Sequence, residues 1–416
     1  MVVESNKRTF QRIAYALYAR YSRLWQSRAF LFSTAAIAGV PNVGKTADLR
    51  KFDLSRANIL VIRSDALGDS ILTLPFLRAL KSQLPAARVT LVVARPWKAF
   101  FESLQVVDEV IGYSFSADKW KATSRVFSAF SIGFKVLRKK HFDVVINPRW
   151  DADFHDAFLL AFFSFAPHRI TFFEKATPWK CSSNRGLDRF YTQVVSDFGT
   201  RHEVARSFQL LRAMGLNSIP EDQFLRLISI ADRVEPAALE LDPSWAGSQL
   251  IGVFPGVQDG KKQWRPENFI ECASLLLRHK PVRFLAFGTS QESGHCRQFC
   301  QALPGVSLDL SGKTGLPKLA GMLRRCSVVI SCDSGGAHLA GALGVPVVVL
   351  FSHLPGADPD CSISPERFRP LGEQVVLLQP PPAKKDFMCQ EGESPINLIS
   401  PGQVAEAALG LISSNK

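Results

Sequence analysis

The sequence predicts an α/β protein with two Rossmann-like, doubly wound domains that face a cleft. The chain has 416 residues, more than one ordinary core accommodates, so two domains are expected. Short apolar runs alternate with helical patterns, which is typical of parallel sheets covered by helices. This alternation fades at residue 217 and restarts at residue 250, which indicates two such units in series.

The first domain is expected over residues 57–235. Its first apolar run, 58–63, is typical of a strand buried on both faces. Further strands are expected at 88–94, 107–112, 142–147 and 169–173. Helical patterns lie between them, at 71–84, from 96 onward, and at 122–140, 153–163 and 201–214. Residues 217–248 mix charges with three prolines and are a linker candidate.

The second domain is expected over residues 245–400. Its strands are expected at 250–254, 282–287, 306–310, 327–331 and 345–351, and its helices at 266–277, 316–325 and 335–343. Residues 401–416 predict a C-terminal helix, since Pro401 after Ser400 is a favourable start. Because ligands of such sheets bind beyond the carboxyl ends of the strands, the site is expected at those ends.

A net charge of +13 makes nucleic acid, phosphorylated substrates and anionic membranes the candidate partners. Residues 1–56 form a basic, aromatic-rich extension; within the first 51 residues, nine Lys and Arg against two Asp and Glu give +7. Two interpretations stand: a helix lying on an anionic membrane surface, or an extension that packs on itself or stays poorly ordered. No run reaches the ~18–20 apolar residues that a membrane-spanning helix needs.

Eight cysteines are scattered along the chain without a C-x-x-C pair. Cys296 and Cys300 are four residues apart, so on a helix they could hold half a metal site. The lack of a second pair beside them favours free thiols in a reducing compartment. We therefore expect no metal.

Residues 63–75, Arg-Ser-Asp-Ala-Leu-Gly-Asp-Ser-Ile-Leu-Thr-Leu-Pro, follow the first buried strand. Gly68 allows a tight turn, and Asp69 lies at a helix start. Asp69 can cap that helix, as Asp commonly does. A carboxylate at the carboxyl end of a strand can also serve as a general base.

The loop from Phe254 to Phe269 is rich in glycine and carries Lys261 and Lys262. Backbone N–H groups and an ammonium suit a diphosphate, and either lysine could neutralise the charge of a leaving group. The other interpretation is a solvated basic loop.

In a third segment, 329–346, a strand runs into Asp333-Ser-Gly-Gly and then a helix of small residues. Glycines let a ligand approach the backbone, and a helix N-terminus offers unpaired N–H groups. Asp333 can accept hydrogen bonds from sugar hydroxyls. His338, inside the helix, is expected to be a hydrogen-bonded structural residue at the edge of this site.

Together these segments resemble glycosyltransferase family 9, the ADP-heptose:lipopolysaccharide heptosyltransferases. The resemblance runs from about Asn58 to the C-terminal helix. It rests on three motifs: Arg63 with Leu67-Gly68-Asp69 and Thr73-Leu74-Pro75; Pro255-Gly256 with Lys262-Gln263-Trp264, where Arg265 stands before Pro266; and Asp333-Ser334-Gly335 with His338-Leu339-Ala340.

The resemblance implies a GT-B fold and an inverting transfer that requires no metal or other cofactor. Asp69 would be the base, and Lys262 would stabilise the departing diphosphate. The donor, expected to be ADP-heptose, would meet Gly256, Glu292, Asp333, Ser334, Gly335, Gly336 and His338. Arg63, Arg149 and Asp151 are expected to bind a lipopolysaccharide-core-type saccharide or glycolipid acceptor. The expected location is cytoplasmic, peripheral on the inner face of the inner membrane, with no nucleic acid partner.

Two alternatives remain. Residues 39–46, Gly-Val-Pro-Asn-Val-Gly-Lys-Thr, satisfy the P-loop pattern of NTPases, which requires a strand before it and a helix after it. A sugar-nucleotide epimerase would share the architecture, but it would not require the Leu-Gly-Asp and Asp-Ser-Gly segments together.

Overall fold

The computed structural model describes residues 40–114, 128–153, 156–196, 199–237, 242–382 and 394–414. The chain divides into two compact units. The first comprises Met1–Ala66, Phe76–Thr200 and Val204–Ile219, and the second Leu67–Pro75, Arg201–Glu203 and Pro220–Lys416. Most of the predicted N-terminal extension, residues 1–39, and the predicted helical stretch at 122–127 lie outside the described residues.

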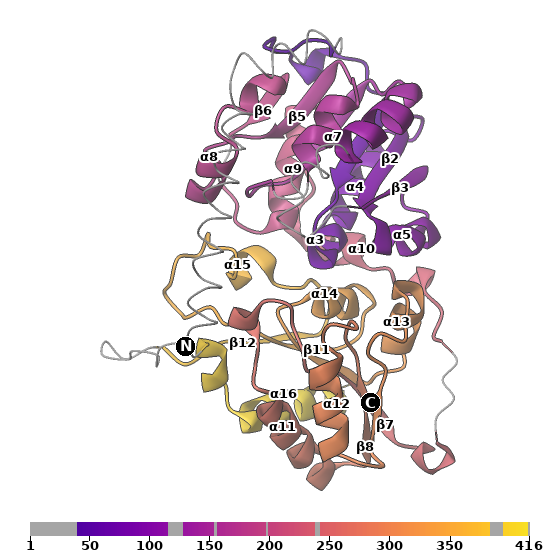
Figure 1. Cartoon of the computed structure of the whole chain (residues 1–416), viewed down its shortest axis with the longest axis vertical. Helices are drawn as coiled ribbons and strands as arrows, with labels where there is room; N and C mark the ends of the chain where they lie inside the picture. Colours follow the sequence, from indigo (N-terminus) through magenta and orange to yellow (C-terminus); the bar gives the residue numbers. More distant parts are fainter. Residues whose placement is uncertain are drawn as a thin grey trace. The chain divides into compact units, whose positions relative to one another are not determined.

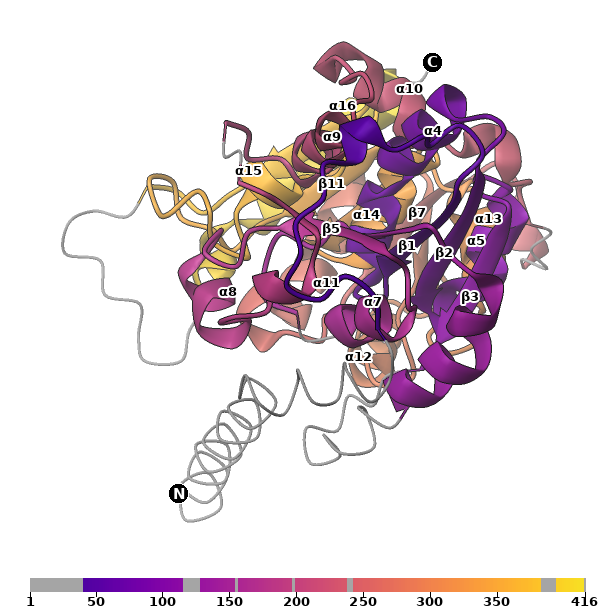
Figure 2. The same cartoon turned by 90° about the horizontal axis from the view of Figure 1, so that it is seen from above.

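The first unit contains a six-stranded parallel sheet with the order β3-β2-β1-β4-β5-β6. Its strands are β1 (Asn58–Arg63), β2 (Arg88–Ala94), β3 (Glu109–Tyr113), β4 (Val144–Asn147), β5 (His168–Phe172) and β6 (Gln193–Val195). Figure 2 shows β3, β2 and β1 in succession. The inner strands are continuous apolar runs because helices cover both faces of a doubly wound sheet.

The helices of this unit are α4 (Leu74–Gln83), α5 (Lys98–Leu104), α7 (Ala157–Phe163), α8 (Pro178–Ser183) and α9 (Glu203–Ala213). On one face of the sheet, α7 packs its aromatic residues against Leu60, Ile62 and Val92. Phe158 and Phe162 of α7 both meet the ring of Phe190, each at 5.5 Å between centroids. These aromatic contacts are part of the hydrophobic core on this face of the sheet.

The second unit repeats the plan, with the strand order β12-β11-β10-β7-β8-β9, again all parallel. Its strands are β7 (Gln249–Phe254), β8 (Val282–Ala286), β9 (Ser307–Asp309), β10 (Val328–Cys332), β11 (Val347–Leu350) and β12 (Val375–Leu378). Its helices, coloured from pink through orange to yellow in Figure 1, are α10 (Phe224–Ile228), α11 (Pro266–His279), α12 (Ser293–Ala302), α13 (Leu316–Leu323), α14 (Gly335–Ala342), α15 (Pro365–Phe368) and α16 (Pro401–Ser414).

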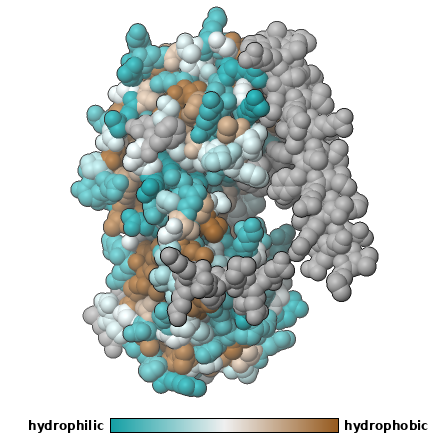
Figure 3. All heavy atoms as spheres, turned by 90° about the vertical axis from the view of Figure 1, so that its left-hand side faces the viewer, coloured by the Kyte–Doolittle hydropathy of each residue, from teal (hydrophilic) through white to brown (hydrophobic). Residues whose placement is uncertain are grey.

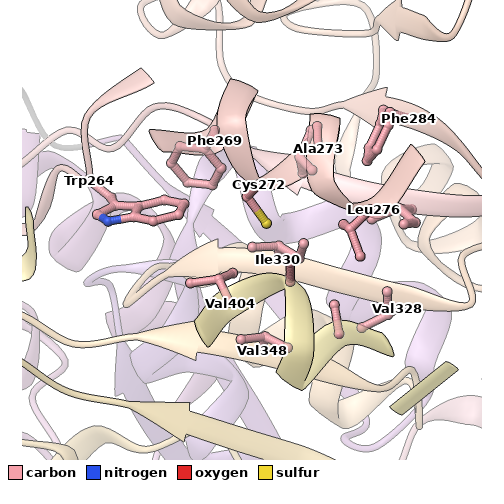
Figure 4. Close-up of a cluster of buried hydrophobic side chains, with 14 of the residues drawn as sticks. Trp264, Phe269, Cys272, Ala273, Leu276, Phe284, Val328, Ile330, Val348 and Val404 are labelled. Carbon is pink, nitrogen blue, oxygen red and sulfur yellow. The ribbon is translucent and has the colours of Figure 1, made fainter. Parts of the chain in front are cut away.

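The core of the second unit lies between its sheet and helices α11, α12 and α16, as the close-up in Figure 4 shows for α11 and the strands. Ile251 and Val253 of β7 face this core, whereas Phe254, the next residue, faces α14 on the other side. Trp264 is fully buried and donates its indole N–H to the Ile399 carbonyl at 3.0 Å. The predicted C-terminal helix is therefore part of this core, and Ser400 accepts from the Gln403 N–H at its start.

These findings confirm the predicted fold class. Numbered from its own first strand, each sheet has the order 3-2-1-4-5-6, whose switch point lies between strands 1 and 4. The switch points are thus β1/β4 in the first unit and β7/β10 in the second. Within the expected linker, residues from Pro220 onward pack with the second unit, where the Ile230 N–H donates to the Ala342 carbonyl at 2.8 Å.

The surface drawn in Figure 3 is mostly hydrophilic, with separate hydrophobic areas between the polar ones. Such a mixed surface is normal for a folded domain. Across the described ranges, no helix combines the length and apolar character needed to cross a bilayer.

Candidate functional site

The second sheet brings two predicted segments together at its switch point. Strand β7 ends at Phe254 and leads into Pro255-Gly256, and the neighbouring β10 ends at Cys332 and leads into Asp333-Ser334. Because parallel strands end at the same edge, both loops lie at the position where doubly wound sheets bind ligands.

Lys262 and Asp333 form the central polar contact of this edge. Lys262 ends the 3₁₀ turn η10 (Gly260–Lys262), which Asp259 caps by accepting from the Lys261 N–H at 3.1 Å. The Lys262 Nζ donates to the Asp333 Oδ2 at 2.5 Å. Burial lowers the pKa of the Lys262 ammonium, but the carboxylates of Asp333, Asp259 and Asp69 outweigh this, so the pKa lies above its usual range. Lys261 is exposed, so Lys262 is the lysine of the pair that lies in the site.

Helix α14 starts directly beside this pair. Its N-cap residue, Ser334, does not cap it with its side chain, because its Oγ shares a hydrogen bond with the Ser331 Oγ at 2.9 Å. The first N–H groups of a helix have no intrahelical acceptor, which makes this end suited to an anion.

The glycines of the Asp-Ser-Gly-Gly segment have a packing role that the sequence did not reveal. A Cβ on Gly336 would lie 2.5 Å from the ring of Phe254, and one on Gly335 would lie 2.9 Å from the Cβ of Leu67. The two glycines therefore let α14 lie against β7 and the segment at Leu67. This packing role is additional to the predicted one, in which the glycines let a ligand approach the backbone, and that role stays a prediction.

Gly256 and Glu292, both predicted donor residues, also lie next to each other. A Cβ on Gly256 would be 2.9 Å from the Cβ of Glu292. The Glu292 carboxylate accepts from the N–H of Thr289 at 2.7 Å and from its hydroxyl at 3.0 Å. Glu292 precedes α12, at the carboxyl end of β8, which is the other neighbour of β7.

Asp69 lies in helix α3 (Leu67–Leu72), which by its contacts belongs to the second unit. The sequence placed the helix start at residue 71 and Asp69 at its cap. The helix instead starts at Leu67, so Asp69 is its third residue and does not occupy the N-cap position. The effect of the Asp69 charge on the pKa of Lys262 shows that the predicted base and the predicted lysine share one electrostatic environment.

His338 of α14 fills the space above Gly68. A Cβ on Gly68 would lie 2.6 Å from the His338 Cδ2, so no other residue fits there without displacement. The ring is buried, its Nδ1 has no hydrogen-bond partner in the described part of the chain, and its Nε2 is 3.9 Å from the Asp333 Oδ1. The residue is buried as expected, and the predicted hydrogen bond of its ring is not formed with any described residue. Burial lowers the pKa of His338 to about 4, so the ring is neutral at pH 7.

The predicted acceptor residues lie at the switch point of the first sheet, and Asp65 connects two of them. The Arg63 Nε is 3.3 Å from the Asp65 Oδ1, and the Arg149 Nη1 pairs with the Asp65 Oδ2. Asp65 is 3% exposed. Sequence reasoning did not select it for this role, although its position two residues beyond β1 was a usable signal.

Asp151 and Arg149 both line a small polar pocket beyond β4 and β5. Asp151 accepts from the Thr177 hydroxyl at 3.0 Å. Lys180, which sequence reasoning also missed, lines the same pocket, and its ammonium donates to the carbonyls of Arg149 and Phe172. Burial lowers the pKa of Lys180 to about 8.

The P-loop interpretation does not fit the fold. Gly39 lies outside the described residues, and the rest of the motif forms a turn followed by extended chain and a 3₁₀ turn, η1 (Leu49–Lys51). A P-loop needs its Lys and Thr at the start of an α-helix. Here the N–H of Gly44 donates to the Arg189 carbonyl at 3.0 Å, which ties the segment to the first unit instead.

Where the structure describes them, the cysteines are free, and no group of three His, Cys, Asp or Glu side chains could hold a metal ion. Cys296 is buried, and burial raises the pKa of its thiol to about 12. Neither Cys296 nor Cys300 forms a disulfide.

The two sheets, with switch points at β1/β4 and β7/β10, define a double-Rossmann protein, and comparison with known proteins makes it a glycosyltransferase. The sequence model of glycosyltransferase family 9 (heptosyltransferase) matches residues 133–394. The chain therefore belongs to glycosyltransferase family 9. This membership favours the transferase over the epimerase alternative.

Several known proteins are similar to this chain over most of their own length. Lipooligosaccharide heptosyltransferase 2 of Haemophilus influenzae is 22% identical over 335 residues, which cover 77% of this chain and 88% of that protein. Lipopolysaccharide heptosyltransferase 3 of Escherichia coli is 23% identical, over 68% of this chain and 79% of its own.

Solved structures share the fold. A family 9 glycosyltransferase of Veillonella parvula has a TM-score of 0.63 at 20% identity, over 88% of this chain and 99% of its own. The E. coli heptosyltransferase WaaC, solved with ADP, has a TM-score of 0.60 at 20% identity, over 86% of this chain and 100% of its own.

Proposed function

We propose that this protein transfers a heptose from ADP-heptose to a saccharide of the lipopolysaccharide-core type, with inversion at the anomeric carbon. The observation that carries the proposal is the Lys262–Asp333 pair at the β7/β10 switch point, beside the N-terminus of α14. The similar proteins from Haemophilus influenzae and E. coli named above are heptosyltransferases, and WaaC was solved with ADP, which supports this choice of donor.

In the proposed complex, the Lys262 ammonium and the first N–H groups of α14 bind the diphosphate. Asp333 is freed from part of its contact with Lys262 and accepts hydrogen bonds from hydroxyls of the donor sugar. Gly256 and Glu292 line the ribose side, and Ser334, Gly335 and Gly336 supply backbone groups. His338 supports this arrangement by packing against Gly68.

Asp69 is the proposed general base. Its carboxylate takes the proton of the acceptor hydroxyl as the hydroxyl oxygen forms a bond to the anomeric carbon. The bond from that carbon to the diphosphate oxygen breaks on the opposite side, and the departing ADP keeps the electron pair. Lys262 stabilises the charge that develops on this oxygen, so the proposed reaction needs no bound metal.

The first unit is proposed to bind the acceptor. Arg149 and Asp151 are partly exposed and would contact it, whereas Arg63 is 4% exposed and would act by holding Asp65. A glycolipid acceptor would place the enzyme in the cytoplasm at the inner face of the inner membrane.

The test has two parts. A panel of nucleotide sugars and free nucleotides is screened for thermal stabilisation of the protein, and ADP release is then followed with and without a lipopolysaccharide-core acceptor. We expect ADP and ADP-heptose to stabilise most, and ADP release to depend on the acceptor. Stabilisation by a uridine nucleotide alone, or ADP release unaffected by the acceptor, would contradict the proposal.

A further inference from the structure

A second surface of the first unit carries exposed aromatic rings. Of the large apolar side chains exposed in the described residues, Phe130 (38% exposed) and Phe134 (42%) are four positions apart on one helical segment. This segment continues into a π-helical turn, η4 (Gly133–Leu137), and a 3₁₀ turn, η5 (Arg138–Lys140). Scattered apolar residues are normal on a surface, but clustered ones mark an interaction site.

The two rings are held in place from below. Phe130 and Phe134 stack with centroids 5.7 Å apart and an interplanar angle of 21°. Phe130 also meets the buried Phe163 edge-on at 5.1 Å, and Phe134 meets Phe165 at 6.2 Å. Gly133 permits this, because a Cβ there would lie 2.3 Å from the Cβ of Phe163. The two rings therefore pack against Phe163 and Phe165 while remaining partly exposed to solvent.

Positive charge surrounds these rings. The Arg138 guanidinium lies 4.9 Å from the centroid of Phe134 and 4.6 Å from that of Phe165. Lys135 and Lys139 are exposed, and neither makes an ion pair with any residue that the structure describes. Lys140, in contrast, is paired with Glu109 at 2.6 Å. Residues 128–140 contain no acidic residue, so every charged side chain of this segment is positive.

We propose that this surface, formed by Phe130, Phe134, Lys135, Arg138 and Lys139, docks on an anionic lipid bilayer. Aromatic rings enter the boundary between headgroups and acyl chains, and neighbouring lysine and arginine side chains contact lipid phosphates. A bilayer needs no fixed pocket to receive two outward rings, and its anionic headgroups complement the positive charges of Lys135, Arg138 and Lys139. The choice of a bilayer also agrees with the proposed function, whose acceptor class includes glycolipids.

The test is sedimentation of the full chain with vesicles of phosphatidylcholine alone, or of phosphatidylcholine and phosphatidylglycerol in equal parts. The variants are Phe130→Ser/Phe134→Ser and Lys135→Ala/Lys139→Ala. The control is Leu225→Ala/Lys318→Ala, because Leu225 is 41% exposed and Lys318 is an exposed lysine of the other unit. The lysine variant removes no buried contact, so it stays informative if the phenylalanine variant is unstable.

We expect the wild type and the control to bind the anionic vesicles more tightly than the neutral ones. Each double variant should lose about tenfold or more in partitioning onto the anionic vesicles. Unchanged binding of both variants would overturn the proposal, and so would equal binding of the wild type to both vesicle types. A dimer that these variants dissociate, without a change in vesicle binding, would identify the surface as an interface between copies and overturn it too. Failure of acceptor-dependent ADP release with vesicle binding intact would contradict the proposed function alone.

Discussion

The ammonium of Lys262 and the carboxylate of Asp333, 71 positions apart in the chain, are in direct contact, with 2.5 Å between Nζ and Oδ2. One follows β7 and the other follows β10, so the pair joins the two strand ends of the switch point. Asp333 thereby holds a cation at the place where the proposed mechanism needs one for the diphosphate.

Replacing Lys262 should weaken donor binding. Lys262→Ala removes the cation and leaves the buried Asp333 carboxylate without it, so we expect at least ~10-fold weaker ADP binding and a stability loss of about 2 kcal/mol. Calorimetric titration with ADP and urea unfolding measure the two effects. Lys261→Ala is the matched control, since Lys261 is exposed. Equal losses in both variants would show that Lys262 has no special role.

Gly68 should tolerate no side chain. Gly68→Ala would place a Cβ 2.6 Å from the His338 ring, so α3 or α14 must move and Asp69 moves with α3. We expect kcat to fall at least ~10-fold, because small displacements of reacting groups are costly. Gly260→Ala is the control, because no atom lies within 4 Å of a Cβ at that position. A Gly68→Ala enzyme with the kcat of the wild type would contradict the placement of α3.

His338 should make the protein sensitive to acid. Its pKa is lowered by burial to about 4, whereas the unfolded side chain titrates near its ordinary 6.5. Its contribution to stability is therefore complete above pH 6.5 and is lost as the pH falls towards 4, by at most about 3 kcal/mol. Urea unfolding of His338→Gln across this range should show a shallower loss than the wild type. Parallel curves for the two proteins would mean that His338 does not titrate as described.

Much of the fold was predictable because buried parallel strands are apolar runs that the sequence shows directly. The strands that were missed are β6 and β12, two short edge strands that are only half-buried. β6 has three residues, which is too short for a clear pattern, whereas β12 (Val375–Leu378) is an apolar run that the sequence does show. Helix α12 was also missed. Its sequence is mostly polar and buries Cys296 and Phe299, so it offers few apolar positions from which a helix can be predicted.

The sequence predicts the three segments of the candidate site, but it does not show which of their residues contact one another. Nothing in the order Lys261-Lys262 shows which lysine meets Asp333, because this depends on a 3₁₀ turn capped by Asp259. In the same way, Gly68 and the ring of His338 pack closely although they are far apart in the chain. The sequence alone does not show such a contact.

The central claim is that Asp69 acts as the base. The most direct test is the rate of acceptor-dependent ADP release by Asp69→Asn, with ADP affinity measured on the same preparation. The variant keeps the size of the side chain and removes its basicity. We expect the rate to fall about 10²–10⁴-fold while ADP affinity stays within about twofold of the wild type. A rate near that of the wild type, with a correctly folded protein, would contradict the assignment of the base.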